Sequence, residues 1–174
     1  MGILKKIVHF LSIITYILII VYAIVCIPMI FGYHPVVVLS GSMEPTYKTG
    51  SVIYYKKVNL KALKEKDVIT YETKNGKFVS HRIVNIDNEL IETKGDANEV
   101  SDINKVRYEN VKGKVAKKSI PYIGYYVRIV NENLTIVVVT AVLILVSEFL
   151  LSNIETFDIN NKNGRSENNA KIKE

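Results

Sequence analysis

Two dense apolar blocks lie near the ends of the chain, and between them short apolar runs are broken by polar residues. The first block extends from Ile7 to about Phe31 and the second from about Leu134 to Leu151. About 20 residues, at about 1.5 Å per residue, cross a hydrocarbon core of about 30 Å. A buried helix is the alternative for the second block, but a small domain offers no core large enough for it. The pattern therefore predicts membrane-spanning helices at residues 7–31 and 134–152.

A cleavable signal peptide is the alternative interpretation of the first block, because Lys5 and Lys6 precede it. The apolar region of such a peptide has about 7–15 residues and ends in a small-x-small pattern. The longer run without that pattern favours a retained anchor. His9 lies near the basic end of the block, where no neighbour in the sequence provides a partner.

The middle of the chain consists of short runs rich in Val, Ile and Tyr, separated by Gly, Asn and Asp. This pattern is typical of strands and turns. The Asn75-Gly76 pair lies between two such runs and predicts a hairpin. We expect a mainly β fold at residues 32–133, a small antiparallel β-domain flanked by the two transmembrane helices, with few helical residues outside the membrane. The predicted strands are 36–40, 51–57, 68–73, 78–86, 89–93 and 111–117.

The segments that flank the spans predict the topology. Tyr122, Tyr125 and Tyr126 precede the second span, as in an interfacial belt. Lysines beside the first span favour a cytoplasmic start at residues 1–6. Two spans then place the β-domain on the extracytoplasmic side of the cell membrane. Residues 153–174 are rich in Asn, Lys and Glu, which predicts a disordered cytoplasmic tail.

The net charge and the cysteine content limit which classes of binding partner and which kinds of site the chain can have. A net charge of +6 suits nucleic acid or anionic lipid. The basic residues are mostly scattered lysines, without an Arg-rich cluster, so we expect membrane lipid as a partner and no nucleic acid. Cys26, the single cysteine, lies in the first apolar block and permits no intrachain disulfide. No metal-ligand spacing is present, and we expect no metal and no cofactor.

Ser42 is the candidate nucleophile, because the neighbouring Gly41 and Pro45 favour a sharp turn that exposes its hydroxyl. An ordinary turn is the alternative. Serine catalysis also needs a base, a group that orients the base, and oxyanion donors. His81 is a candidate base, although chemistry alone allows His34 equally. Asp96 and Asp102 are the candidate orienting carboxylates.

Four motifs resemble the conserved boxes of type I signal peptidases and occur in the same order. They are Ser40-Gly41-Ser42-Met43-Glu44-Pro45-Thr46, Gly50-Ser51-Val52-Ile53, Ser80-His81-Arg82-Ile83-Val84 and Lys94-Gly95-Asp96-Ala97-Asn98. Pro121-Tyr122-Ile123-Gly124-Tyr125 is similar to the segment that closes the catalytic domain. The resemblance covers roughly residues 36–126 and the flanking spans. Histidine at position 81, where the common bacterial branch has lysine, is similar to the endoplasmic-reticulum and archaeal branch.

The resemblance implies a membrane-bound serine endopeptidase that cleaves signal peptides from exported preproteins, with a translocon as a further partner. Ser42 would attack the scissile carbonyl and His81 would act as general base. Asp102 matches the orienting acid, and Asp96 would support the site or share that role. Ser40 would complete an oxyanion hole with the backbone N–H of Ser42.

Four further residues lie in or near these motifs. Ser51 stands where many relatives have aspartate. Val36, Met43 and Ile53 either line shallow pockets for small side chains or are ordinary core residues.

Two alternatives use the same residues differently. A noncatalytic, membrane-anchored β-domain could act as a scaffold or partner subunit, but a scaffold has no need to keep Ser42, His81, Asp96 and Asp102 together. A protease that cuts within the bilayer is the other. Its candidate residues would then lie in an apolar block, whereas they lie in the polar middle of this chain.

Overall fold

The computed structural model describes the backbone of residues 2–171 and the side chains of residues 3–154. Contacts divide the chain into two units, one formed by residues 22–132 and the other by residues 1–21 and 133–174. The first contains the sheet and the second most of the apolar helical residues. The helices are α1 (Gly2–Cys26), η1 (Ile27–Phe31), η2 (Gly41–Met43), η3 (Leu60–Ala62), η4 (Tyr108–Asn110), α2 (Ile123–Glu132) and α3 (Leu134–Lys171).

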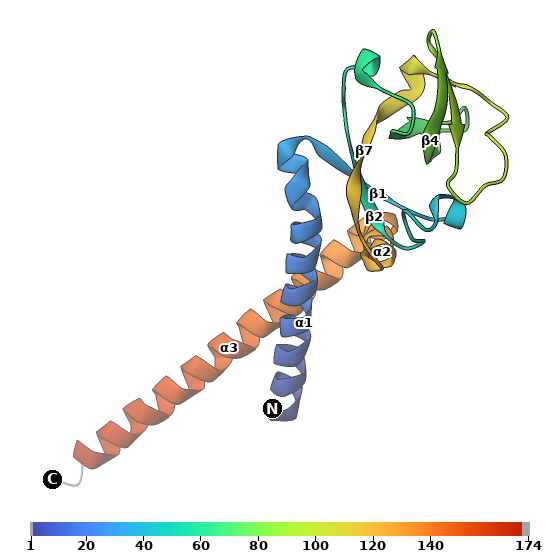
Figure 1. The fold of residues 1–174 in the computed structure, drawn as a ribbon. Coiled ribbons are helices and arrows are strands. Elements are labelled where there is room, and N and C mark those ends of the chain that lie inside the picture. Colours follow the sequence, from blue (N-terminus) through green and yellow to red (C-terminus); the bar gives the residue numbers. More distant parts are fainter. Residues whose placement is uncertain (1, 172–174) are drawn as a thin grey trace. The chain divides into compact units, whose positions relative to one another are not determined.

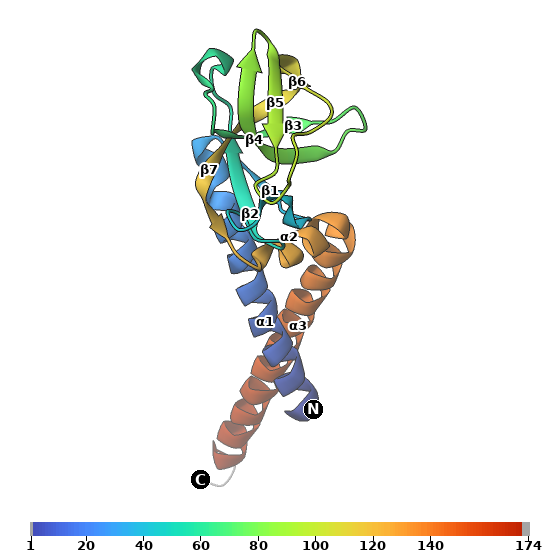
Figure 2. The same cartoon turned by 45° about the vertical axis from the view of Figure 1, so that its right-hand side comes forward.

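The sheet has seven strands in the order β1-β2-β7-β3-β4-β5-β6, and every paired neighbour is antiparallel (Figures 1 and 2). The strands are β1 (Tyr33–Val37), β2 (Val52–Lys56), β3 (Val68–Glu72), β4 (Phe78–Asp87), β5 (Leu90–Lys94), β6 (Val106–Arg107) and β7 (Val111–Ile120). The predicted antiparallel β fold with two flanking apolar helices is confirmed. Gly76 closes the expected β3–β4 hairpin with φ of 71°, a conformation that glycine adopts without a steric penalty.

Apolar side chains cover both faces of the central strands. One cluster contains Ile69, Tyr71, Ile83 and Ile91, and a second contains Met43, Tyr47, Ile53, Val68 and Val115. Successive residues of a strand point to opposite faces, so Val68 and Ile69 belong to different clusters. His81 pairs with Ile69 across β3 and β4 and therefore shares its face. The packed core on that face sets the position of the histidine.

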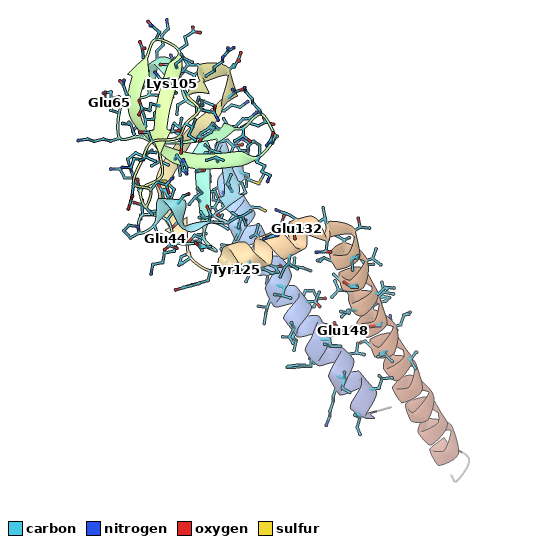
Figure 3. All side chains as sticks on the ribbon, turned by 90° about the vertical axis from the view of Figure 1, so that its right-hand side faces the viewer. Glu44, Glu65, Lys105, Tyr125, Glu132 and Glu148 are labelled. Carbon is cyan, nitrogen blue, oxygen red and sulfur yellow. The ribbon has the colours of Figure 1, made fainter. Side chains whose placement is uncertain are left out.

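Helix α2 lies within the predicted β-domain and was not expected. Gly124, Val127 and Val130 form its buried side, spaced three residues apart as on one face of a helix. Gly124 packs against the backbone of Gly50 so closely that an added Cβ would lie 2.7 Å from its carbonyl oxygen. Tyr125, labelled in Figure 3, covers Gly50 with its ring. The short strand β6 was also missed, because two residues carry no periodic signal.

Two described helices, Ile3–Phe31 and Leu134–Ile154, are long and apolar enough to cross a membrane. α3 continues to Lys171, so the backbone of much of the segment expected to be a disordered tail is helical here, while residues 172–174 lie outside the described part. No proline lies in this segment to stop the helix. The cytoplasmic position of the tail stays a prediction.

His9 has a partner that its sequence neighbourhood did not reveal. Its Nδ1 lies 2.8 Å from Oε1 of Glu148, which belongs to α3 and is labelled in Figure 3. Both residues belong to the helical unit. Each of these two polar side chains thereby has a hydrogen-bonding partner, which would reduce the cost of placing it in lipid.

The core cluster beneath His81 should dominate the stability of the domain. Ile91 is fully buried in it, so Ile91→Ala should lower the free energy of unfolding by about 2–5 kcal/mol through lost burial and a cavity. Ile103 is 99% exposed, and Ile103→Ala should change stability by less than about 0.5 kcal/mol. Denaturant unfolding in detergent, followed by near-UV circular dichroism of the tyrosines, measures both; equal losses would contradict this account of the core.

Candidate active site

The loop that carries Ser42 is a short 3₁₀ turn held at both ends. Ser40 is extended, with φ of −136° and ψ of 161°, and η2 begins at the next residue. The Glu44 N–H donates to the Gly41 carbonyl at 3.0 Å, and the Ala97 N–H donates to the Ser42 carbonyl at 2.9 Å. Met43, the residue after Ser42, is buried in the core and anchors the loop there. Backbone bonds and one anchored side chain thus set the position of the hydroxyl.

His81, on β4, contacts the serine with one ring nitrogen and a carboxylate with the other. Its Nε2 lies 3.1 Å from Ser42 Oγ, and its Nδ1 lies 2.6 Å from Asp102 Oδ2. The histidine is 8% exposed. Ser42 lies 39 positions before His81 in the sequence, and Asp102 lies 21 positions after it. The two contacts join the three residues into one chain of hydrogen bonds.

Asp102 reaches His81 because the loop after β5 returns along that strand. The Asp102 N–H donates to the Thr93 carbonyl at 2.8 Å. The Asp102 Oδ2 accepts hydrogen bonds from Thr93 Oγ1 at 2.6 Å and from Tyr71 Oη at 3.2 Å. An ionised carboxylate only accepts, so we assign the proton of neutral His81 to Nδ1. Nε2 is then free to accept from the Ser42 hydroxyl.

Asp96 lies in a separate ion pair. Its two carboxylate oxygens accept from Arg82 Nε at 2.7 Å and Nη2 at 2.6 Å, and Thr46 Oγ1 also donates to it at 2.5 Å. The hydrogen bonds from Arg82 lower the pKa of Asp96 below its ordinary value, and the hydrogen bond from Thr46 lowers it further by a smaller amount. Asp96 therefore ties β4 to the serine loop.

Two other predicted groups lie near the serine. Ser40 Oγ is 3.4 Å from Ser42 Oγ, which places a second hydroxyl beside the candidate nucleophile. Val36, Met43 and Ile53 line a cavity of about 340 Å³ that Ser42 and His81 also border. Met43 and Ile53 are core residues as well, so the two interpretations of these side chains hold together.

Two residues considered from the sequence lie elsewhere. His34 stacks on Tyr55, with ring centroids 5.1 Å apart. Ser51 is buried, and its hydroxyl has no hydrogen-bond partner among the described residues. No group of three or more His, Cys, Asp or Glu side chains suited to a metal ion occurs among the described residues.

Sequence reasoning missed Thr93 and Tyr71, which contact Asp102. Tyr71 lies on β3 and Thr93 on β5, one on each side of the strand that carries His81. Their positions within predicted strands were visible, but nothing in the sequence shows that a later loop brings a carboxylate to them.

Known proteins match the part of the chain that contains the sheet and the candidate site. A family model described as signal peptidase, peptidase S26, matches residues 9–136. Signal peptidase I W of Bacillus subtilis is 40% identical over 131 residues, which make up 68% of this chain and 69% of that protein. The signal peptidase complex catalytic subunit SEC11 of Lodderomyces elongisporus is 36% identical over 111 residues, or 56% of this chain and 66% of that protein. The SEC11 subunit of Candida tropicalis is 36% identical over 112 residues, with the same coverage of 56% and 66%.

The matched region contains the sheet, the serine loop and both partners of His81, and the expected family resemblance is thereby confirmed. The chain belongs to the signal peptidase family, peptidase S26.

Proposed function

We propose that this chain is a membrane-bound serine endopeptidase that cleaves amino-terminal signal peptides from exported preproteins, with Ser42 as nucleophile and His81 as general base. The observation that carries the proposal is the continuous hydrogen-bond chain from Ser42 Oγ through His81 to Asp102, in a member of this family. This arrangement supplies a nucleophile, a base and an orienting carboxylate in contact with one another.

The reaction follows from these contacts. His81 Nε2 accepts the Ser42 hydroxyl proton as Oγ attacks the scissile carbonyl carbon. The Ser42 N–H and the Ser40 hydroxyl donate to the developing oxyanion. Protonated His81 then gives its proton to the leaving amine, and an ester links Ser42 to the signal peptide. Water, activated by the same nitrogen, hydrolyses the ester and restores the enzyme.

Asp102 holds the His81 ring in the tautomer that this sequence needs, and its charge stabilises the imidazolium. Asp96 supports the site by joining Arg82 and Thr46 rather than by contacting the histidine. The contacts of Asp102 with His81, and of Asp96 with Arg82 and Thr46, support this division of roles between the two carboxylates.

The cavity beside Ser42 suits a small side chain next to the cleaved bond. Its lining includes Val36, Met43 and Ile53, which are apolar, and its volume is about 340 Å³. Signal peptides end in small residues before the cleavage site. The segment that binds here would be the one that follows the apolar core of the signal peptide.

We further propose that both apolar helices span the cell membrane, with the sheet on the extracytoplasmic side. Lys5 and Lys6, beside the first helix, favour a cytoplasmic amino terminus. Membrane lipid and the translocon that delivers preproteins are then the expected partners.

Ser42→Ala should lower preprotein cleavage by at least about a thousandfold, because no other described hydroxyl has the same contact with His81 Nε2. Ser51→Ala is the matched control: its buried hydroxyl has no partner among the described residues, and cleavage should be unchanged. Purified variants in detergent, assayed on a signal-peptide-bearing preprotein, give both rates. Equal cleavage by wild type and Ser42→Ala would favour a noncatalytic role instead.

The two carboxylates should respond differently to replacement by amide. Asp102→Asn should lower kcat by about 10⁴-fold, because an amide can hold His81 in the wrong tautomer. Asp96→Asn should lower kcat by less than about tenfold, since its contacts are to Arg82 and Thr46. Single-turnover cleavage rates separate the two; a larger loss at position 96 would reverse the roles assigned here.

The Asp96 ion pair should make stability depend on acid. The pKa of Asp96 is lowered in the folded state, so its contribution is complete at neutral pH and is lost as pH falls below about 4. Asp96→Asn should cost about 1–3 kcal/mol at pH 7, and the difference from wild type should shrink toward pH 2. Asp87→Asn is an exposed control that should change little. Thermal unfolding across pH tests this, and a difference that grows in acid would contradict it.

A further inference from the structure

One oxygen of Asp102 receives hydrogen bonds from three side chains on three adjacent strands. Tyr71 on β3, His81 on β4 and Thr93 on β5 all contact Oδ2, at 3.2, 2.6 and 2.6 Å. The carboxylate comes from a loop outside the sheet, and its own N–H is bonded to the Thr93 carbonyl at 2.8 Å. Thr93 thus contacts Asp102 through both its backbone and its side chain.

Both neutral donors are enclosed by protein. Thr93 is fully buried, and Tyr71 is 8% exposed. Burial is the main cause that raises the pKa of Tyr71 to about 12, so its hydroxyl keeps its proton at working pH. Thr93 Oγ1 is also 3.5 Å from Tyr71 Oη, but its 2.6 Å contact with Asp102 is the shorter. Each hydroxyl therefore acts as a donor to the carboxylate.

The other charged side chains near this network either form an ion pair or line the groove that borders it. Asp96 is bonded to Arg82, and Lys74, Lys77 and Lys105 line the groove that borders Asp102 and His81. Hydrogen-bond donors that contact a carboxylate favour its ionised form. Among these groups, Thr93 and Tyr71 are the ones that bond directly to the oxygen facing His81.

We propose that Thr93 and Tyr71 are positioning residues that keep Asp102 ionised and turned toward His81. The inference rests on the proposed serine mechanism and extends it to two residues that touch neither substrate nor nucleophile. Their hydroxyls stabilise the negative charge of Oδ2 by hydrogen bonding. The carboxylate therefore stabilises the protonated form of His81 less strongly than it would without them. Without them, the partly enclosed carboxylate of Asp102 would favour the protonated form of His81, and the neutral base would form only at higher pH.

The test is the pH dependence of kcat/KM for preprotein cleavage by the full chain in detergent. Thr93→Val, which keeps the shape and removes the donor, should lower kcat/KM by about tenfold at neutral pH. The acidic limb of its pH profile, where kcat/KM rises with pH, should move to higher pH by about half a unit or more. Tyr71→Phe should shift the limb in the same direction but less, because its bond is longer. Thr93→Ser, which keeps the donor, should restore the wild-type limb.

Thr70→Val is the matched control for the loss of a buried threonine hydroxyl. Thr70 is as buried as Thr93, but its Oγ1 bonds Ser80 Oγ at 2.8 Å instead of Asp102. Thr70→Val should lower thermal stability without moving the acidic limb. A Thr93→Val limb that stays in place or moves to lower pH, or one that Thr70→Val reproduces, would overturn the positioning role.

Failure of the serine mechanism itself gives a different result. Cleavage that persists in Ser42→Ala would remove the proposed function, whatever the behaviour of Thr93. Loss of cleavage in Ser42→Ala together with wild-type pH profiles for Thr93→Val and Tyr71→Phe would keep the function and remove only the positioning role.

Discussion

The hydrogen bond between Asp102 and His81 is the contact on which the site depends. At 2.6 Å it selects the imidazole tautomer, and the tautomer decides that Nε2 faces Ser42 as an acceptor. The Asp102 carboxylate is partly enclosed, with its side chain 20% exposed. Hydrogen-bond donors from neighbouring strands offset the loss of water, which links the chemistry to the packing of the sheet.

The sheet provides this environment because strand geometry brings alternate residues to one face. His81 shares its face with Ile69 and Ile83, and these belong to the apolar cluster that holds β3, β4 and β5 together. Ser42 and Asp102 come from a 3₁₀ turn and a loop, while His81 comes from strand β4. Ser42 is held by backbone bonds and by the buried side chain of Met43. The sheet thus positions the histidine, and anchored loops bring Ser42 and Asp102 to it.

The second carboxylate shows how similar side chains acquire different tasks. Asp96 lies one residue after Gly95, where an added Cβ would lie 2.5 Å from the Ser42 carbonyl oxygen. Close backbone packing therefore brings its loop against the serine loop, and Arg82 binds its carboxylate from β4. The result is an ion pair that joins two parts of the site. In the helical unit, His9 and Glu148 form a comparable contact between α1 and α3.

The sequence by itself determined the elements with strong local signals. Two apolar blocks, alternating strands and the Asn75-Gly76 turn depend on nearby residues, and Ser42 and His81 lie in short motifs that can be matched directly. Only the tertiary structure decided which carboxylate meets His81 and that Tyr71 and Thr93 surround it. The path of the loop after β5 sets those contacts, and that path follows from packing between residues far apart in the chain. Helix α2 was decided in the same way, because Gly124 docks on the backbone of a loop about seventy residues earlier.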